Sequence, residues 1–280
     1  MTGDNEEFRF VSLLALELEN ADISLPSLPD VVMKIRKMLQ DENSDFEQIS
    51  RAVSLDPVLV SRLFVFANSA FYNRANIRIE TVDGAIGRLG VEVVRNTAMS
   101  MAMKQLYTAE KHSHADKLMR AVWARGMKLS CMSYAIARHD SKLSDETAFL
   151  CGLLNEVGKL YIITKAEDFP NLLGERKSFN LVLEKWNAQI SKSIIESWGF
   201  SDEVAQSADP DSYLDHESDS AACFVDVVYV AKRLIDHAQE EALDFAEESS
   251  CVKLKIDDQT IGKVMDGYRE KLKTMQQTLA

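Results

Sequence analysis

Apolar residues recur every three or four positions along most of this chain, and this spacing indicates amphipathic helices rather than strands. The clearest stripe lies within residues 115–139 and consists of Leu118, Val122, Leu129, Met132 and Ile136. A second stripe lies within residues 219–237 and consists of Ala221, Val225, Val228 and Ile235. Further helices are expected over residues 8–20, 180–198 and 260–279. The predicted fold class is therefore all-α.

Capping residues place several of the helix ends. Pro residues keep Leu25–Pro29 extended, so Asp30 is expected to cap a helix that runs to about Gln40. Further helix starts are predicted at the capping box of Ser44 and Glu47, at Asp56 before Pro57, at Thr81 and at Ser144. Gly90 is expected to end the helix that Thr81 begins. Residues 240–258 are polar and acidic, and a short extended piece is expected at Cys251–Ile256.

Composition narrows the class of protein further. With 11 Gly and 5 Pro in 280 residues, the chain has few of the turn residues that a sheet-rich fold needs. A net charge of −12 opposes binding to phosphate backbones, so no nucleic-acid partner is expected. No secretory signal and no membrane-spanning stretch are visible, and the chain is therefore expected to work in the cytoplasm without contact to a membrane. The four cysteines are expected to be reduced, buried thiols: Cys131, Cys151, Cys223 and Cys251.

Six short segments form a pattern through their order and spacing: Leu25–Val31, Asp56–Pro57, Asn68–Tyr72, Ala85–Gly90, Val94–Asn96 and Cys151–Leu160. Together they resemble the HDOD family, whose name stands for HD-related output domain. The resemblance implies a compact multi-helix HD-like fold and a place in bacterial signalling. It divides the chain into a helix over residues 1–20, an HDOD domain over 21–240, and an acidic segment with a C-terminal helix over 241–280. Within the domain it implies an N-terminal helical lobe (21–110) and a degenerate HD-like lobe (111–240).

The resemblance also says where a metal would be held. In the HD phosphohydrolases, a His, a His-Asp pair on the next helix and a later Asp bind divalent metal, which activates a water molecule. The His-Asp pair falls on Asn155 and Glu156, the first His at or near Arg125, and the final Asp at or near Lys232. Arg offers no lone pair, Lys is a cation, and an Asn amide is a weak ligand. The resemblance therefore implies four vestigial positions, with no metal, no cofactor and no catalytic residue.

Helical spacing adds an argument that does not depend on the resemblance. Arg125 lies four residues before Leu129, and Lys232 lies four residues after Val228, so both cations fall on apolar stripes. Such long side chains either extend to water or pair with a carboxylate. The second reading predicts that Glu156 is buried and contacts Arg125, Lys232 or both.

A second set of residues is a candidate for docking a partner. Asn68 follows a predicted helix end, and the aromatic rings of Phe71 and Tyr72 are expected either to fill a gap between helices or to face a partner. Five arginines, Arg62, Arg74, Arg78, Arg88 and Arg95, make a basic run that is either a solvated face or a patch for an acidic or phosphate-bearing ligand, and the last four are the docking candidates.

The resemblance, together with the replaced metal ligands, implies a non-catalytic regulatory module that binds other signalling or regulatory proteins. One alternative is a divergent metal-dependent phosphohydrolase that uses Glu156 with His139 or His112. Another is a sensor of a nucleotide-like small ligand, for which the arginines and Lys159 would supply the cations. No nearby group supports a metal-binding role for His114, His216 or His237.

Overall fold

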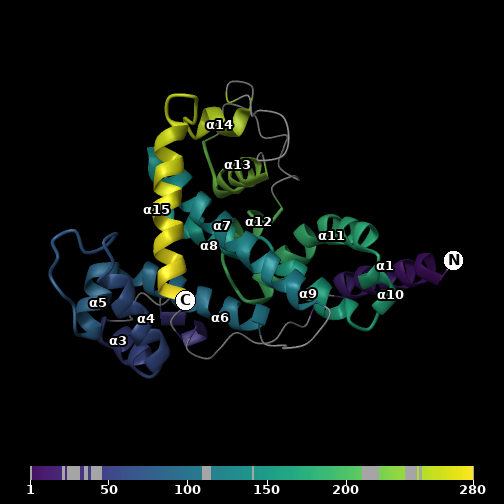
Figure 1. The fold of residues 1–280 in the computed structure, drawn as a ribbon, viewed down its shortest axis with the longest axis horizontal. Coiled ribbons are helices and arrows are strands. Elements are labelled where there is room, and N and C mark those ends of the chain that lie inside the picture. The colour runs from purple at the N-terminus through teal and green to yellow at the C-terminus, as the bar shows by residue number, and fades with distance from the viewer. Residues whose placement is uncertain are drawn as a thin grey trace. The chain divides into compact units, whose positions relative to one another are not determined.

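The computed structural model describes residues 2–20, 23, 32–34, 37–38, 46–108, 115–140, 142–209, 221–236, 245 and 248–279. Every regular element in these ranges is a helix, which confirms the predicted all-α class (Figure 1). Among the described helices, none combines the length and the apolar character that crossing a bilayer requires.

The chain forms two compact units. Unit 1 comprises Met1–Leu25 and Tyr107–Val264, and unit 2 comprises Pro26–Leu106 and Met265–Ala280. The helices that lie wholly in unit 1 are α1 (Thr2–Glu19), α7 (Asp116–Asp140), α8 (Asp145–Leu154), α9 (Val157–Ala166), α10 (Pro170–Gly174), α11 (Arg176–Ser197), α12 (Asp202–Gln206), α13 (Phe224–Asp236) and α14 (Ser249–Lys253). Unit 2 holds α3 (Phe46–Ser54), α4 (Pro57–Ala67), α5 (Val82–Leu89), most of α6 (Val91–Thr108) and most of α15 (Ile261–Leu279). The N-terminal helix α1 thus belongs to unit 1, and most of the C-terminal helix α15 belongs to unit 2.

Unit 1 is built around α7, which packs along α8 and α13, while α9 packs along α11 (Figure 1). Two glycines permit the closest approaches. A Cβ atom on Gly152 would lie 2.6 Å from the Cα of Ser130 in α7. A Cβ atom on Gly158 would lie 2.5 Å from the carbonyl oxygen of Asn187 in α11. Any larger residue at either glycine would therefore push two helix backbones apart.

The helix ends of unit 2 follow the local signals in the sequence. The Asp56 carboxylate accepts hydrogen bonds from the backbone N–H groups of Val58 and Leu59, with Pro57 at the first position of α4. Thr81 caps α5 in the same way through Gly84, and Gly90 ends it with a φ of 80°. In unit 1, Ser144 caps α8 as expected.

Two parts of unit 1 differ from the sequence analysis. The extended piece expected at Cys251–Ile256 is wrong, because α14 covers Ser249–Lys253 and Lys255 then turns the chain with a φ of 55°. Cys251 and Leu254 are buried three residues apart, which is helical spacing and not the alternation of a strand. In addition, α9 and the short helices α10 and α12 were not placed from sequence.

Some expectations lie outside the described residues. They include the Leu25–Pro29 segment, the caps at Asp30 and Ser44, and four histidines: His112, His114, His216 and His237. Of the helix expected up to Gln40, only residues 32–34 and 37–38 are described, and they are helical.

Candidate functional site

The interruption between α8 and α9 places Asn155 and Glu156 in the interior of unit 1, where they are 0% and 2% exposed. The first N–H groups of α9 are satisfied by side chains of α11. Ser191 Oγ accepts a hydrogen bond from Gly158 N at 2.8 Å, and Asn187 Oδ1 accepts one from Lys159 N at 3.0 Å. Glu156, at the capping position of α9, makes no side-chain cap, so its carboxylate is available for contacts in the interior.

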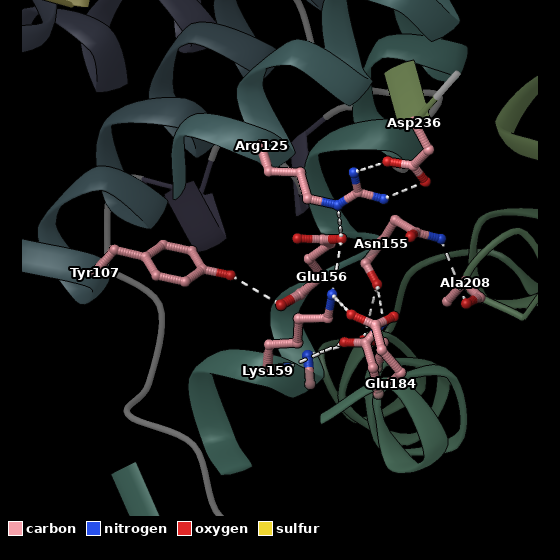
Figure 2. A network of polar contacts seen from close by, with 11 residues as sticks. Tyr107, Arg125, Asn155, Glu156, Lys159, Glu184, Ala208 and Asp236 are labelled. Atoms are coloured by element: carbon pink, nitrogen blue, oxygen red, sulfur yellow. Dashed lines mark hydrogen bonds and ion pairs between the residues drawn. The ribbon is translucent and has the colours of Figure 1, made fainter. Parts of the chain in front are cut away.

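One oxygen of that carboxylate binds two cations (Figure 2). Arg125 of α7 donates from Nε to Glu156 Oε1 at 2.7 Å, and Lys159 of α9 donates from Nζ to the same oxygen at 3.2 Å. The side chain of Lys159 is 6% exposed and that of Arg125 is 28% exposed. These two contacts confirm the prediction that Glu156 is buried beside Arg125.

Two outer carboxylates complete what we call the charge cluster, which consists of Arg125, Glu156, Lys159, Glu184 and Asp236. Asp236 at the end of α13 accepts from both terminal nitrogens of the Arg125 guanidinium. Glu184 of α11 accepts from Lys159 Nζ at 2.7 Å. Their side chains are 55% and 69% exposed. Negative and positive charges therefore alternate along the cluster. Each of the two cations lies between the buried carboxylate of Glu156 and one exposed carboxylate.

Burial and nearby charges change the pKa values of Arg125, which belongs to the cluster, and of Tyr107, which contacts Glu156. Desolvation lowers the pKa of Arg125, but its hydrogen bonds to Asp236 and Glu156 and the attraction of both carboxylates outweigh that effect and raise the pKa above its ordinary value. Burial, and secondarily the nearby Glu156 charge, raise the pKa of Tyr107 well above 10.0. The Tyr107 hydroxyl thus stays protonated and donates to the Glu156 backbone carbonyl at 3.0 Å.

Asn155 connects the helix junction to its neighbours. Its side-chain Nδ2 donates to the backbone carbonyl oxygens of Ser207 and Ala208 at 3.2 and 3.4 Å. Its backbone carbonyl oxygen accepts from the side chains of Asn187 and Ser191. The Asn155 side chain therefore ties α8 to the chain that follows α12.

The donor set at this place does not fit a divalent metal ion. Among the described residues, no group of three or more His, Cys, Asp and Glu side chains is positioned to hold one. Glu156 stands where the resemblance puts the Asp of the His-Asp pair, and its Oε1 already accepts from two cations. A divalent ion there would face a guanidinium and an ammonium, which repel it.

The other predicted site residues in unit 1 lie elsewhere. Lys232 of α13 is half-buried and forms no ion pair with any residue that the structure describes. Asp236, one helical turn further on, contacts Arg125 instead. His139 lies fourteen residues after Arg125 on α7, which is about 21 Å of helix rise. His139 is thus too far along the helix to share an ion with Glu156.

In unit 2, two of the candidate docking residues brace the loop between α4 and α5. Asn68 Oδ1 accepts from Ile79 N at 2.8 Å, while its Nδ2 donates to the carbonyl oxygens of Ile79 and Phe64 at 2.9 Å. Arg88 Nη1 donates to the Ile77 carbonyl at 2.7 Å. Both side chains therefore hold the two ends of the loop together.

The remaining candidates differ in exposure and in their contacts. Phe71 and Tyr72 are half-buried and contact each other, with ring centroids 4.8 Å apart. Arg78 is exposed and pairs with Glu80, and Arg95 Nε donates to Asn96. Arg74 is exposed. A partner-docking role for these residues stays a prediction.

Sequence reasoning did not place Glu184 and Asp236 in the site, and it considered Lys159 only as a ligand-binding cation. Lys159 could have been found, because it lies three residues after Glu156 and so shares its helix face. Glu184 and Asp236 lie 28 and 80 residues from Glu156 and carry no local signal.

Comparison with known proteins assigns a family to this arrangement. The family model of the HDOD domain matches residues 25–210, which is more than half of the chain. An uncharacterised protein of Treponema pallidum (strain Nichols) is 22% identical over 162 residues. The match covers 57% of this chain and only 30% of that relative.

Two solved structures show the same fold. One comes from Shewanella amazonensis SB2B and is named provisionally as a metal-dependent phosphohydrolase; it is 23% identical, with a TM-score of 0.78 over 97% of this chain and 99% of the other. The second is an HDOD domain protein of unknown function from Geobacter sulfurreducens, 19% identical, with a TM-score of 0.71 over 95% and 97% of the two chains.

Proposed function

The chain belongs to the HDOD family, and from that premise we propose that it is a non-catalytic regulatory module. It acts by binding other signalling or regulatory proteins in a bacterial signalling pathway. Its four cysteines are free thiols, which supports a reducing, cytoplasmic setting. Cys131, Cys151 and Cys251 are buried, but Cys223 is only half-buried, so the expected burial is wrong for Cys223.

The charge cluster is the observation that carries the proposal. A hydrolase of the HD type needs a site that holds a metal ion and a water molecule. Here Arg125 and Lys159 hold the Glu156 carboxylate between them, so side-chain cations replace the charge that a metal would supply. The buried carboxylate of the cluster thus already accepts from two side-chain cations, which compete with a divalent ion for it.

A hydrolysis assay on the full chain tests the proposal. The wild-type chain is incubated with p-nitrophenyl phosphate, bis-p-nitrophenyl phosphate and a set of nucleotides, each in Mg²⁺, Mn²⁺ or Fe²⁺. Glu156→Gln keeps the shape of the side chain and removes the buried carboxylate of the charge cluster. We expect no turnover above buffer for either chain. Metal-dependent turnover that wild type shows and Glu156→Gln lacks would contradict the proposal and support a phosphohydrolase.

A further inference from the structure

Lys271 of α15 is buried among aromatic rings in unit 2. The residue is 1% exposed, and its ammonium lies 5.7, 5.8 and 5.7 Å from the ring centroids of Phe66, Phe71 and Tyr72. It also donates to the Tyr72 hydroxyl at 3.1 Å. All three distances fall within the range at which a ring face attracts a cation. We call the three rings the aromatic cage.

The cage is built locally and braced independently of α15. Its rings come from seven consecutive positions, Phe66 to Tyr72, and the Tyr72 ring contacts both Phe66 and Phe71 with centroids 4.8 Å apart. Asn68 and Arg88 fix the loop that carries it through backbone contacts to residues 64–79. The cation, by contrast, comes from a helix about 200 residues later in the chain. The cage can therefore persist when that helix leaves.

The buried face of α15 shows which pattern of side chains binds at the cage and beside it. After Lys271, the buried side chains are Thr274, Met275, Thr278 and Leu279. Lys104 of α6 donates to the carbonyl of Leu279 at the end of the helix. The pattern is that of an amphipathic helix with a lysine at position i, small polar residues at i+3 and i+7, and apolar residues at i+4 and i+8.

We propose that the aromatic cage is a lysine-binding site, that α15 is its intramolecular ligand, and that a partner helix with the same lysine pattern competes with α15 for it. The Lys271 ammonium is attracted by the three ring faces and donates to the Tyr72 hydroxyl, and an apolar side chain of similar length makes neither contact, so the lysine is the specific feature of the contact. A lysine-bearing helix is also favoured by the net charge of −12 on this chain. The proposal concerns unit 2 and does not depend on the charge cluster of unit 1.

Hydrogen exchange of the full chain tests the intramolecular contact. We compare wild type with Lys271→Met and with Lys273→Met, a matched control, because Lys273 is exposed on the same helix. We expect amide exchange over residues 265–279 to rise at least tenfold in Lys271→Met, with α7 and α8 unchanged, and to stay at the wild-type rate in Lys273→Met. Unchanged exchange in α15, or a rise throughout both units, would overturn the proposal.

A peptide added in trans tests the competition. A fluorescein-labelled peptide with the sequence of residues 260–279 is titrated with each full-length chain, and its anisotropy is measured. We expect the Lys271→Met chain to bind this peptide at least tenfold more tightly than wild type does, because its own helix no longer occupies the cage. A peptide that carries Lys271→Met should bind neither chain. Equal affinity for both peptides, or equal binding by both chains, would show that the cage does not recognise lysine.

Discussion

At the scale of the residue, a single carboxylate oxygen joins the two cations of the charge cluster. Glu156 Oε1 accepts from both Arg125 and Lys159, while no described residue donates to Oε2. Removing this carboxylate would leave two cations without their buried partner. Asp236 and Glu184 contact the same cations from positions more than half exposed, where water replaces most of the interaction. The inner and outer carboxylates should therefore differ greatly in their effect on stability.

We expect Glu156→Ala to lower the free energy of unfolding by about 3 kcal/mol, the usual cost of breaking a buried ion pair. The matched control, Glu184→Ala, removes an exposed partner of the same Lys159 and should cost less than about 1 kcal/mol. Urea denaturation of the three chains, followed by circular dichroism, gives both values. Equal losses in the two variants would mean that Glu156 has no special role in the cluster.

A second prediction at this scale concerns the pH dependence of stability that Cys251 causes. Burial, and then the nearby Glu248 charge, raise the pKa of its thiol from 9.0 to about 12. The folded state therefore favours the neutral thiol, and its contribution to stability is complete below pH 9 and lost as the pH rises toward 12. Between pH 8 and pH 10.5, wild type should lose about 1 to 2 kcal/mol more than Cys251→Ala does. Urea titrations at both pH values measure this difference, and parallel losses in the two chains would argue against it.

At the scale of the element, the Cys151–Leu160 segment works as a junction between four helices. Gly152 lets α8 touch the backbone of α7, and Gly158 lets α9 touch the backbone of α11. These two contacts fix the position of Glu156, which lies between them. Close packing thus explains both glycines of this segment, which is one of the six that carry the family resemblance.

Gly158→Ala should destabilise the chain, because its Cβ atom would lie within 3.0 Å of the backbone of Asn187 and Ser191. Overpacking of this kind costs about 1 to 3 kcal/mol. Gly126→Ala is the matched control, since its Cβ atom would meet only the Leu153 carbonyl oxygen, at 3.9 Å. Thermal unfolding should show a melting temperature several degrees lower for Gly158→Ala and an unchanged or higher one for Gly126→Ala. A Gly158→Ala chain as stable as wild type would contradict the packing.

Local signals explain which elements could be predicted from the sequence. The caps at Asp56, Thr81 and Ser144 and the stop at Gly90 each depend on contacts within four residues, and all of them are confirmed. The start of α9 could not be found in this way, since side chains of α11 satisfy its first N–H groups. The extended piece expected at Cys251–Ile256 is wrong, since Cys251 and Leu254 are buried in unit 1 at helical spacing and α14 begins at Ser249.

At the scale of the whole molecule, the fold could be predicted from the sequence more completely than the site. Helical periodicity and ordered motifs were enough for the all-α class and the HDOD family. The pairing of Arg125 with Glu156 was also predicted, because the two positions correspond to ligands that converge in the related enzymes. The outer partners, Glu184 and Asp236, depend on how α11 and α13 pack in unit 1, which no local pattern encodes.

The central claim is that side-chain cations stand in the charge cluster where a related hydrolase would hold a metal ion. The most direct test is to load the purified full chain with Mn²⁺, Fe²⁺ or Zn²⁺ in turn, remove unbound ions, and determine the bound metal by elemental analysis. Glu156→Ala is measured in parallel. We expect far less than one ion per chain in both, because Arg125 and Lys159 repel a divalent cation at Glu156. One ion per wild-type chain that Glu156→Ala fails to bind would contradict the account.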